Sequence, residues 1–217
     1  MIVALIPAKK NSTRLLRKNI RILRGKPLFQ HSVESAKKSK KIKKVFVSSN
    51  DTEILSTARK LNCETVVRPE KISGKKTSMN VVIKHFIDYL EKKKIYAKCI
   101  VLLQPTSPFR KKKLKDKLIS KFLLSKKTLV TVKRENIKFL KGIVTINKKN
   151  FPIFPKYFNS NDQELPSYYI PNGSIYIFNI KNFKKNNSIP IQNLSIYEMF
   201  GKYNVNIDTL EDLKNAN

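Results

Sequence analysis

The sequence is poor in cysteine and in long apolar runs, and each shortage excludes a class of protein. Only two cysteines occur, Cys63 and Cys99, each in an apolar context. This excludes a disulfide framework and a zinc-finger spacing. We expect both cysteines to be buried thiols. No apolar run approaches the roughly 18 residues of a membrane-spanning helix, and residues 1–6 have neither the charged start nor the length of a signal peptide. We therefore expect a cytoplasmic protein with no membrane partner.

Glycine is missing where phosphate-binding loops usually need it. None of the five glycines lies between Pro7 and Lys18, so neither G-x-x-x-x-G-K-[ST] nor G-x-G-x-x-G is present. The stretch follows residues 2–6, a β-branched apolar run that predicts a buried strand ended by Pro7. It carries cations and polar donors suited to phosphate oxygens, namely Lys9, Lys10, Asn11, Ser12, Thr13, Arg14, Arg17, Lys18 and Asn19.

The strand would deliver this basic loop to the carboxyl edge of a sheet, where α/β proteins bind their ligands. With no glycine nest, side chains would do most of the phosphate binding. The alternative is a solvated basic loop in a lysine-rich protein, since charge runs are usually solvated. The loop alone does not decide between the two interpretations.

Acidic residues are also few. The chain has 15 aspartates and glutamates against 46 lysines and arginines, a net charge of +31. Such a charge suggests nucleic-acid binding through counterion release. The excess is nearly all lysine, accompanied by abundant asparagine and isoleucine, as an AT-rich coding bias produces, and it is spread over the whole chain. A nucleic-acid surface would be one patch mixed with aromatics or arginine. We therefore keep nucleic-acid binding only as the hypothesis outside the enzymes.

Length and pattern predict one α/β domain. A chain of 217 residues with 41% hydrophobic residues can bury a sizeable core. Apolar residues at helical spacing over 79–90 give the strongest periodic signal. Strands separated by helices of this length predict parallel pairing with right-handed crossovers, and so a doubly wound, mostly parallel sheet. The predicted strands here are 2–6, 44–48, 64–67, 98–103 and 128–132.

The pattern changes between 135 and 170. Residues 142–146 and 151–154 predict short antiparallel strands, so we expect an arm that leaves the sheet. Two further strands are predicted at 172–178 and 204–207. Thr209 and Asp212 have the spacing of a capping box, which predicts a terminal helix.

Five motifs occur in one order along the chain. They are Ile6-Pro7-Ala8 with Ser12 and Lys18-Asn19; Arg68-Pro69 with Thr77-Ser78; residues 104–110 (Gln-Pro-Thr-Ser-Pro-Phe-Arg); residues 171–176 (Pro-Asn-Gly-Ser-Ile-Tyr); and Ile207-Asp208-Thr209 before Asp212-Leu213. In order and spacing the chain resembles the acylneuraminate cytidylyltransferase (CMP-sialic acid synthetase) family over essentially its whole length. The Gln-Pro-Thr-Ser-Pro-x-Arg block is the most specific match.

The resemblance implies a fold, an assembly and a reaction. The fold would be that of the nucleotide-diphospho-sugar transferases. The assembly would be a homodimer in which the arm of one subunit reaches towards the other's site. In the reaction, CTP and a nine-carbon α-keto acid sugar would give the CMP-sugar and pyrophosphate, with Mg²⁺. The sugar's anomeric hydroxyl would attack the α-phosphate in line, so the protein must mainly position groups and neutralise charge.

The resemblance also implies which residues form the site. Lys18 and Asp208 would be catalytic, with Asp208 as the Mg²⁺ ligand. Three of the implied residues have ordinary structural alternatives: Ser78 as a helix cap, Tyr176 as a core aromatic and Gln104 as a turn residue. The nucleotide would be bound by Lys9, Asn11, Ser12, Arg14, Asn19 and Ser78, and the sugar by Gln104, Arg110, Asn172 and Tyr176.

The chain departs from the family pattern at several positions. Lys9 stands where arginine is usual, which replaces a bidentate fork by a point charge, and Thr13 stands where lysine is usual. Asn206 replaces the first aspartate of the family's Asp-x-Asp. Asp208 is then the one carboxylate expected to bind the metal.

The identity of the sugar stays open. The arm lacks the family's usual basic residues near Asp162 and Ile170, so derivatives of legionaminic or pseudaminic acid, or KDO, are alternatives to N-acetylneuraminate. Another nucleotidyltransferase of the same fold, with a different sugar or base, is the second enzyme hypothesis.

Overall fold

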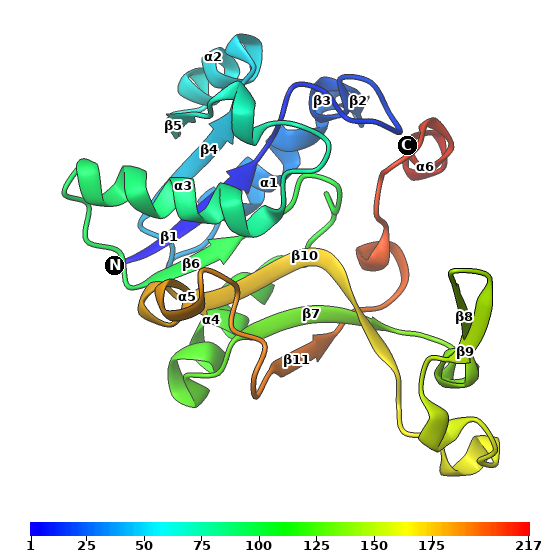
Figure 1. Ribbon diagram of the computed structural model, residues 1–217. Helices are drawn as coiled ribbons and strands as arrows, with labels where there is room; N and C mark the ends of the chain where they lie inside the picture. The colour runs from blue at the N-terminus through cyan, green and yellow to red at the C-terminus, as the bar shows by residue number, and fades with distance from the viewer.

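The computed structural model describes residues 1–217 and is built on a 7-stranded sheet with the strand order β11-β7-β10-β6-β1-β4-β5 (Figure 1). Strand β1 pairs in parallel with β4 and β6, β4 with β5, and β7 with β11. Only β10 runs antiparallel to both of its neighbours. The prediction of a mostly parallel sheet is confirmed. The strands are β1 (Ile2–Pro7), β4 (Lys44–Ser49), β5 (Glu64–Val67), β6 (Cys99–Leu102), β7 (Leu129–Arg134), β10 (Tyr169–Asn179) and β11 (Ser195–Glu198).

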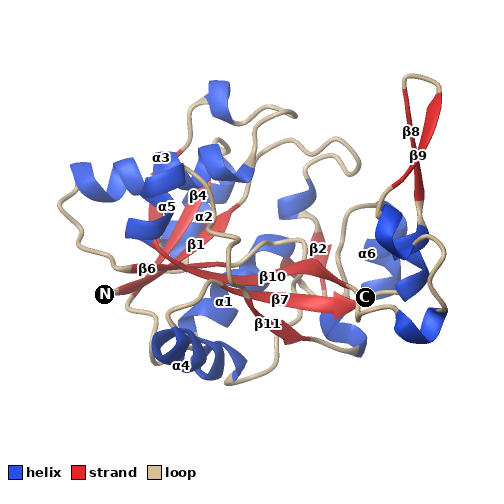
Figure 2. Ribbon diagram, turned by 60° about the horizontal axis from the view of Figure 1, so that its bottom comes forward, coloured by secondary structure: helices blue, strands red, loops and turns tan.

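Helices cover both faces of this sheet, as Figure 2 shows for α3 and α4. Successive strand residues point to opposite faces, so Ala4 and Ile6 join the core under α1, α2 and α4, whereas Val3 and Leu5 join the core under α3 and α5. None of the helices is long and apolar enough to cross a membrane. The helices are α1 (Leu28–Lys37), α2 (Thr52–Lys60), α3 (Met79–Lys92), α4 (Leu114–Ser125), α5 (Ile180–Asn186) and α6 (Leu210–Ala216).

Side-chain caps fix where several helices begin. Asp51 caps α2 by accepting from the backbone N–H groups of Glu53 and Ile54. Ser78 caps α3 by accepting from Val81 N–H. Thr209 and Asp212 form the predicted capping box of α6. These caps satisfy N–H groups that have no partner within their own helix.

The predicted strand at 204–207 is wrong. Asn204 ends a 3₁₀ helix that begins at Gly201, and Ile207 N–H donates to the Thr106 carbonyl at 2.7 Å instead of joining the sheet. The alternation of Val205 and Ile207 with asparagine imitates a half-buried strand, but Ile207 packs beside α6. The edge strand on this side is β11, which the sequence pattern did not indicate.

The arm leaves the sheet between β7 and β10 and projects beyond the end of the sheet (Figure 1). Its hairpin consists of β8 (Ile143–Ile146) and β9 (Lys149–Pro152), so the second strand begins two residues earlier than predicted. Asn147 and Lys148 have positive φ angles of 50° and 63°, as a two-residue hairpin turn requires. A second small hairpin, β2 (Ile22–Leu23) with β3 (Lys26–Pro27), precedes α1.

Candidate functional site

A cleft of about 160 Å³ opens where β1, β5 and β6 end. Parallel strands bring their carboxyl ends to one edge, which is where the sequence placed the basic loop. The loop after β1 supplies one wall, the segment after β5 a second and the segment after β6 a third. The lining includes Lys9, Ser12, Lys18 and Asn19; Arg68, Ser73, Gly74 and Thr77; and Gln104, Pro105 and Thr106.

Three cations and no carboxylate line the cleft. Lys9 Nζ donates to the Gly74 carbonyl at 3.3 Å, and its pKa is lowered by burial and by the nearby Arg68 and Lys18. Arg68 is buried and donates to the Ser48 carbonyl at 2.6 Å, and burial lowers its pKa to about 10. Three cationic side chains without a carboxylate make the cleft suited to a polyanion such as a triphosphate.

Arg68 is the residue that the sequence reasoning did not assign to the site. It stands directly after β5 and before Pro69, where the strand must end. A cation at the carboxyl end of a strand next to β4 was the signal that could have found it.

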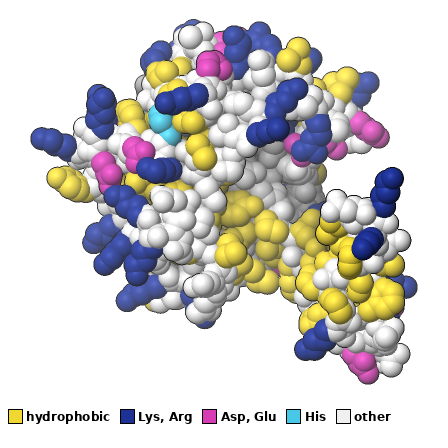
Figure 3. All heavy atoms as spheres, viewed as in Figure 1, with side chains coloured by type: hydrophobic (Ala, Val, Ile, Leu, Met, Phe, Trp, Pro, Cys, Tyr) yellow, Lys and Arg dark blue, Asp and Glu magenta, His cyan; other side chains and the backbone are white.

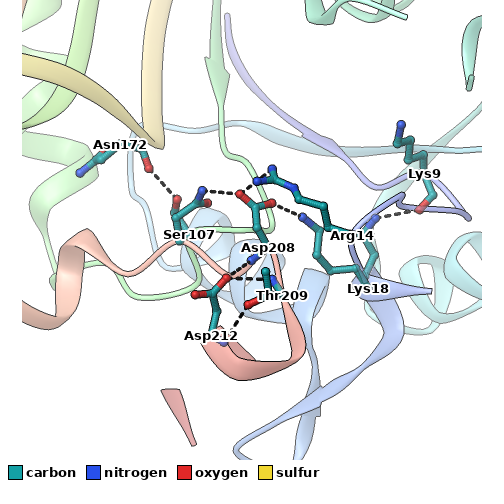
Figure 4. Close-up of polar contacts among 10 residues, drawn as sticks. Lys9, Arg14, Lys18, Ser107, Asn172, Asp208, Thr209 and Asp212 are labelled. Carbon is teal, nitrogen blue, oxygen red and sulfur yellow. Dashed lines mark hydrogen bonds and ion pairs between the residues drawn. The ribbon is translucent and has the colours of Figure 1, made fainter. Parts of the chain in front are cut away.

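The carboxylate of Asp208 lies beside the cleft and links the C-terminal segment of the chain to the basic loop near its N-terminus (Figure 4). Its Oδ1 accepts from Lys18 Nζ at 2.7 Å, and Lys18 is only 8% exposed. Its Oδ2 pairs with Arg14 Nη2 at 2.9 Å and accepts from Asn206 Nδ2 at 2.8 Å. Asp208 and the basic loop therefore meet beside the cleft, although no strand leads to Asp208.

The start of α6 holds this carboxylate in place. Asp212 Oδ2 accepts from the backbone N–H groups of Asp208 and Thr209 at 2.9 and 2.8 Å (Figure 4). These two bonds lower the pKa of Asp212. With the bond from Ile207 N–H to Thr106, they fix the backbone on both sides of Asp208.

Two residues of the basic loop shape its backbone and rim. Asn19 is 5% exposed, and its Nδ2 donates to the Lys9 carbonyl at 2.8 Å, which ties the two ends of the loop together. Ser12 lines the cleft and also a neighbouring hollow. Asn11 lines only that neighbouring hollow, together with Asn50 and Glu70.

Gln104 reaches the cleft beside a glycine that the packing requires. A Cβ on Gly173 would lie 2.9 Å from Gln104 Oε1, and Gly173 has a φ of +74°. The Asn172 side chain accepts from Thr131 Oγ1 at 2.7 Å and donates to Asn204 Oδ1 at 2.9 Å. Asn172 is thus a buried support next to the cleft and not part of its lining.

The other predicted sugar and base residues also lie outside the cleft lining. Arg110 donates to the carbonyls of Gln104 and Ser174, both at 2.9 Å, so its guanidinium ties two segments together. Tyr176 lies opposite Leu102 on β6 and packs on the core under α3, and burial raises its pKa. Ser78 caps α3, whereas Thr77 and Met79 on either side of it line the cleft.

The structure offers no ready-made metal centre: no group of three or more histidine, cysteine or acidic side chains is placed to hold an ion. Asp208 is the one carboxylate beside the cleft among the predicted site residues, and cations and an amide occupy its oxygens. Any metal here would need most of its oxygen ligands from a bound nucleotide, an arrangement that Mg²⁺ commonly adopts.

Comparison with known proteins agrees with this architecture. A family model described as Cytidylyltransferase matches residues 3–211. The pseudaminic acid cytidylyltransferase of Campylobacter jejuni subsp. jejuni serotype O:2 is 26% identical over 99% of this chain and 94% of its own length. The CMP-N,N'-diacetyllegionaminic acid synthase of Legionella pneumophila subsp. pneumophila is 31% identical over 86% of this chain and 82% of its own.

A solved structure supports the fold. That of a CMP:2-keto-3-deoxy-manno-octonic acid synthetase complexed with CTP superposes with a TM-score of 0.71 at 15% identity, over 99% of this chain and 95% of that one. At this identity the likeness concerns the fold alone. The family match over residues 3–211, together with the relatives and the five motifs, shows that this chain belongs to the cytidylyltransferase family.

Proposed function

We propose that the protein transfers CMP from CTP to a nine-carbon α-keto acid sugar and releases pyrophosphate. The observation that carries this proposal is the cleft at the sheet edge, whose lining has Lys9, Lys18 and Arg68 and no carboxylate. In the transfer, the anomeric oxygen of the sugar bonds to the α-phosphorus while the bond to the β-phosphate's bridging oxygen breaks. The hydroxyl proton passes to water or a nearby base, and the pyrophosphate takes the bonding electron pair.

The side chains around the cleft divide this work. Lys9, Lys18 and Arg68 neutralise the triphosphate and the departing pyrophosphate, which is the main requirement of phosphoryl chemistry. Asn19 positions Lys9 through the backbone. Gln104 lines the end of the cleft next to Gly173, where we place the sugar. Its main-chain carbonyl is held by Arg110, which we therefore assign to positioning and not to substrate contact.

Magnesium fits this site through Asp208. One carboxylate together with phosphate oxygens is a usual ligand set for Mg²⁺, and Asp208 lies directly beside Lys18 of the cleft. The bound ion would supply charge neutralisation at the phosphates. Because Asn206 is neutral, we propose weak binding by one ion. Titration of Mn²⁺ into the CTP complex, followed by electron paramagnetic resonance, tests this without turnover: Asp208→Asn should weaken Mn²⁺ binding to the level that free CTP gives under the same conditions.

The sugar is the finer part of the proposal. The Campylobacter and Legionella relatives are named for pseudaminic and diacetyllegionaminic acids, and both match most of this chain. We therefore propose an acid of this nine-carbon class and keep KDO as the alternative. Figure 3 shows lysines and arginines in several places on the visible face, in line with their spread along the chain, and nucleic-acid binding stays the hypothesis outside the enzymes.

We also propose that a second copy of the chain covers the arm. Large apolar side chains are exposed on the arm, and in Figure 3 they form a patch that continues from the arm onto the adjoining surface of the main body. Contiguous exposed apolar surface of this kind usually marks an interface. Sedimentation equilibrium should give a dimer, and Ile143→Asp together with Phe151→Asp should give a monomer. The exposed apolar residues of the arm are Phe139, Ile143, Val144, Ile146, Phe151, Ile153, Phe154 and Phe158.

A pyrophosphate-release assay tests the reaction, the base and the sugar together. Each of the four ribonucleoside triphosphates is paired with pseudaminic, legionaminic and N-acetylneuraminic acids and with KDO. We expect release with CTP and a nine-carbon acid, and little with UTP, because the wrong base leaves buried polar groups unpaired. Equal turnover with UTP, or release with KDO alone, would contradict the proposal.

A further inference from the structure

A second basic hollow lies between α1 and α4, away from the cleft. Its volume is about 470 Å³. Helix α1 supplies one wall, the first turn of α4 another, and the segment that carries Arg110 the floor. The lining residues that bear charge or a hydroxyl are Arg24, His31, Glu34, Ser35, Lys38, Arg110, Lys112, Lys115, Lys202 and Tyr203.

The cations of this hollow have no free carboxylate to pair with. Glu34 is the only acidic residue in the lining, and both of its oxygens accept from Lys26 Nζ, at 2.7 and 2.9 Å. The ring of His31 is engaged with the Leu23 carbonyl at 2.9 Å. The lining therefore carries an excess of positive charge.

Lys115 is the unusual member of the set. It is only 3% exposed, and its ammonium makes no hydrogen bond and no ion pair. The adjacent Asp116 is occupied by the Ser39 hydroxyl and by Lys40 N–H. Burial and the charge of Arg110 lower the pKa of Lys115 to about 8, so it is still protonated at pH 7. A cation on a largely buried side chain with no carboxylate partner is costly, and a bound anion would offset that cost.

An unpaired donor lies on the facing wall. The hydroxyl oxygen of Ser35 on α1 is buried and has no hydrogen-bond partner. Buried polar groups without partners are few in folded proteins, and each calls for an explanation. An oxyanion in this hollow would meet the Lys115 ammonium directly and would gain the Ser35 hydroxyl once that side chain rotates about its Cα–Cβ bond.

We propose that this hollow is a second anion site, which takes one phosphate dianion on Lys115 and Ser35. The ligand is inorganic phosphate or the phosphate group of a small metabolite. Arg110 lines the same hollow and also holds the Gln104 carbonyl, so the bound anion adjoins the segment that carries Gln104 into the cleft. The inference stands on these residues and does not depend on which sugar the enzyme activates.

Phosphate titration followed by ¹H–¹⁵N NMR locates the binding. Inorganic phosphate is added at pH 7, with chloride at equal ionic strength as the reference and glycerol 3-phosphate as a second arm. We expect the amide signals of Ser35 and Lys115 to shift and saturate. Lys115→Met should weaken this binding about tenfold or more, since a charged hydrogen bond is lost. Lys117→Met, which removes an exposed charge from the same helix outside the hollow, should leave it unchanged.

Ser35→Ala is a second variant that keeps the fold and removes only the hydroxyl, and it should weaken phosphate severalfold. A stronger response to glycerol 3-phosphate than to phosphate would identify the metabolite as the source. Shifts confined to the cleft amides of Lys9 and Asn19 would overturn the proposal. So would unsaturated drifts that chloride reproduces, because diffuse surface charge would then account for the binding.

Discussion

The cleft and the hollow are both lined by cations, but only the buried lysine of the cleft pairs with a carboxylate. In the cleft, Lys18 is 8% exposed and meets Asp208 at 2.7 Å. In the hollow, Lys115 is 3% exposed and meets no carboxylate. The net charge of +31 does not separate these two lysines from the rest. Burial and ion pairing distinguish these two lysines. Lys18 has a counter-charge within the protein, whereas the counter-charge of Lys115 must come from a ligand.

The largest expected effect is at the counter-charge of the cleft. Asp208→Asn should reduce turnover about a thousandfold or more at every magnesium concentration, because the carboxylate that pairs with Lys18 and Arg14, and that we propose as the magnesium ligand, is lost. Circular dichroism should stay unchanged, since Thr209 and Asp212 still cap α6. Asp88→Asn, at an exposed ion pair with Lys84, is the control for loss of one negative charge. Near-parental turnover by Asp208→Asn would refute the catalytic role.

The counterpart in the hollow concerns stability. Lys115→Met should raise the free energy of unfolding by about 1–3 kcal/mol at pH 7 in phosphate-free buffer, because it removes a buried cation without a partner. The penalty arises from burial and from Arg110 and Lys38, with Asp116 opposing them. Urea denaturation measures it, and Lys117→Met should change the free energy by less than about 0.5 kcal/mol.

The same pair of variants gives a pH dependence with a defined sign. The folded-state pKa of Lys115, about 8, lies below the 10.5 of an unfolded lysine. Between these values the unfolded chain holds the proton and the folded chain does not, so the parent gains stability as pH rises. The advantage of Lys115→Met should therefore be full below pH 8 and shrink towards pH 10.5. A constant advantage would show that Lys115 titrates normally.

Ser78→Ala tests whether Ser78 belongs to the nucleotide-binding cleft. Loss of the α3 cap should cost about 1 kcal/mol of stability in thermal unfolding. The KM for CTP should stay close to that of the parent, because Ser78 is not part of the cleft lining, whereas Thr77 is. A large rise in KM without a loss of stability would instead support the assignment of Ser78 to the base.

The smallest expected effect tests the weak metal site. Asn206→Asp supplies a second carboxylate two residues from Asp208, so it should lower the magnesium concentration for half-maximal rate by a few-fold, under about 1 kcal/mol. The rate at saturating magnesium should change little. Magnesium titration of initial rates measures both. An unchanged or raised half-maximal concentration would mean that this position does not face the metal.

Local signals in the sequence were sufficient for most of the fold. The helical spacing over 79–90 predicted α3, and the Thr209 and Asp212 spacing predicted the cap of α6. The strand prediction for residues 204–207 was wrong because a loop that packs on α6 can also alternate apolar and polar side chains. The reversed direction of β10 depends on the return from the arm, a long-range feature that periodicity does not contain.

The site could be predicted in part for the same reason. The loop after β1 was placed correctly because a strand delivers its carboxyl end to the ligand edge. The sequence motifs could not reveal that the polar groups of Arg110 and Asn172 form hydrogen bonds within the protein, because those bonds join residues far apart in the chain. Arg68 was named in a motif but not assigned to the site, although its place at the end of β5 was a usable signal, whereas Lys115 stands out from the other lysines only once its burial is known.

The central claim is that CTP is bound by particular cations of the cleft and not by the general charge of the protein. Isothermal titration of CTP into Lys18→Ala and Lys10→Ala tests it most directly, because both lysines belong to the same basic loop and only Lys18 lines the cleft. We predict about a tenfold or greater loss of affinity for Lys18→Ala and a change within about twofold for Lys10→Ala. Equal losses in the two variants would contradict the account.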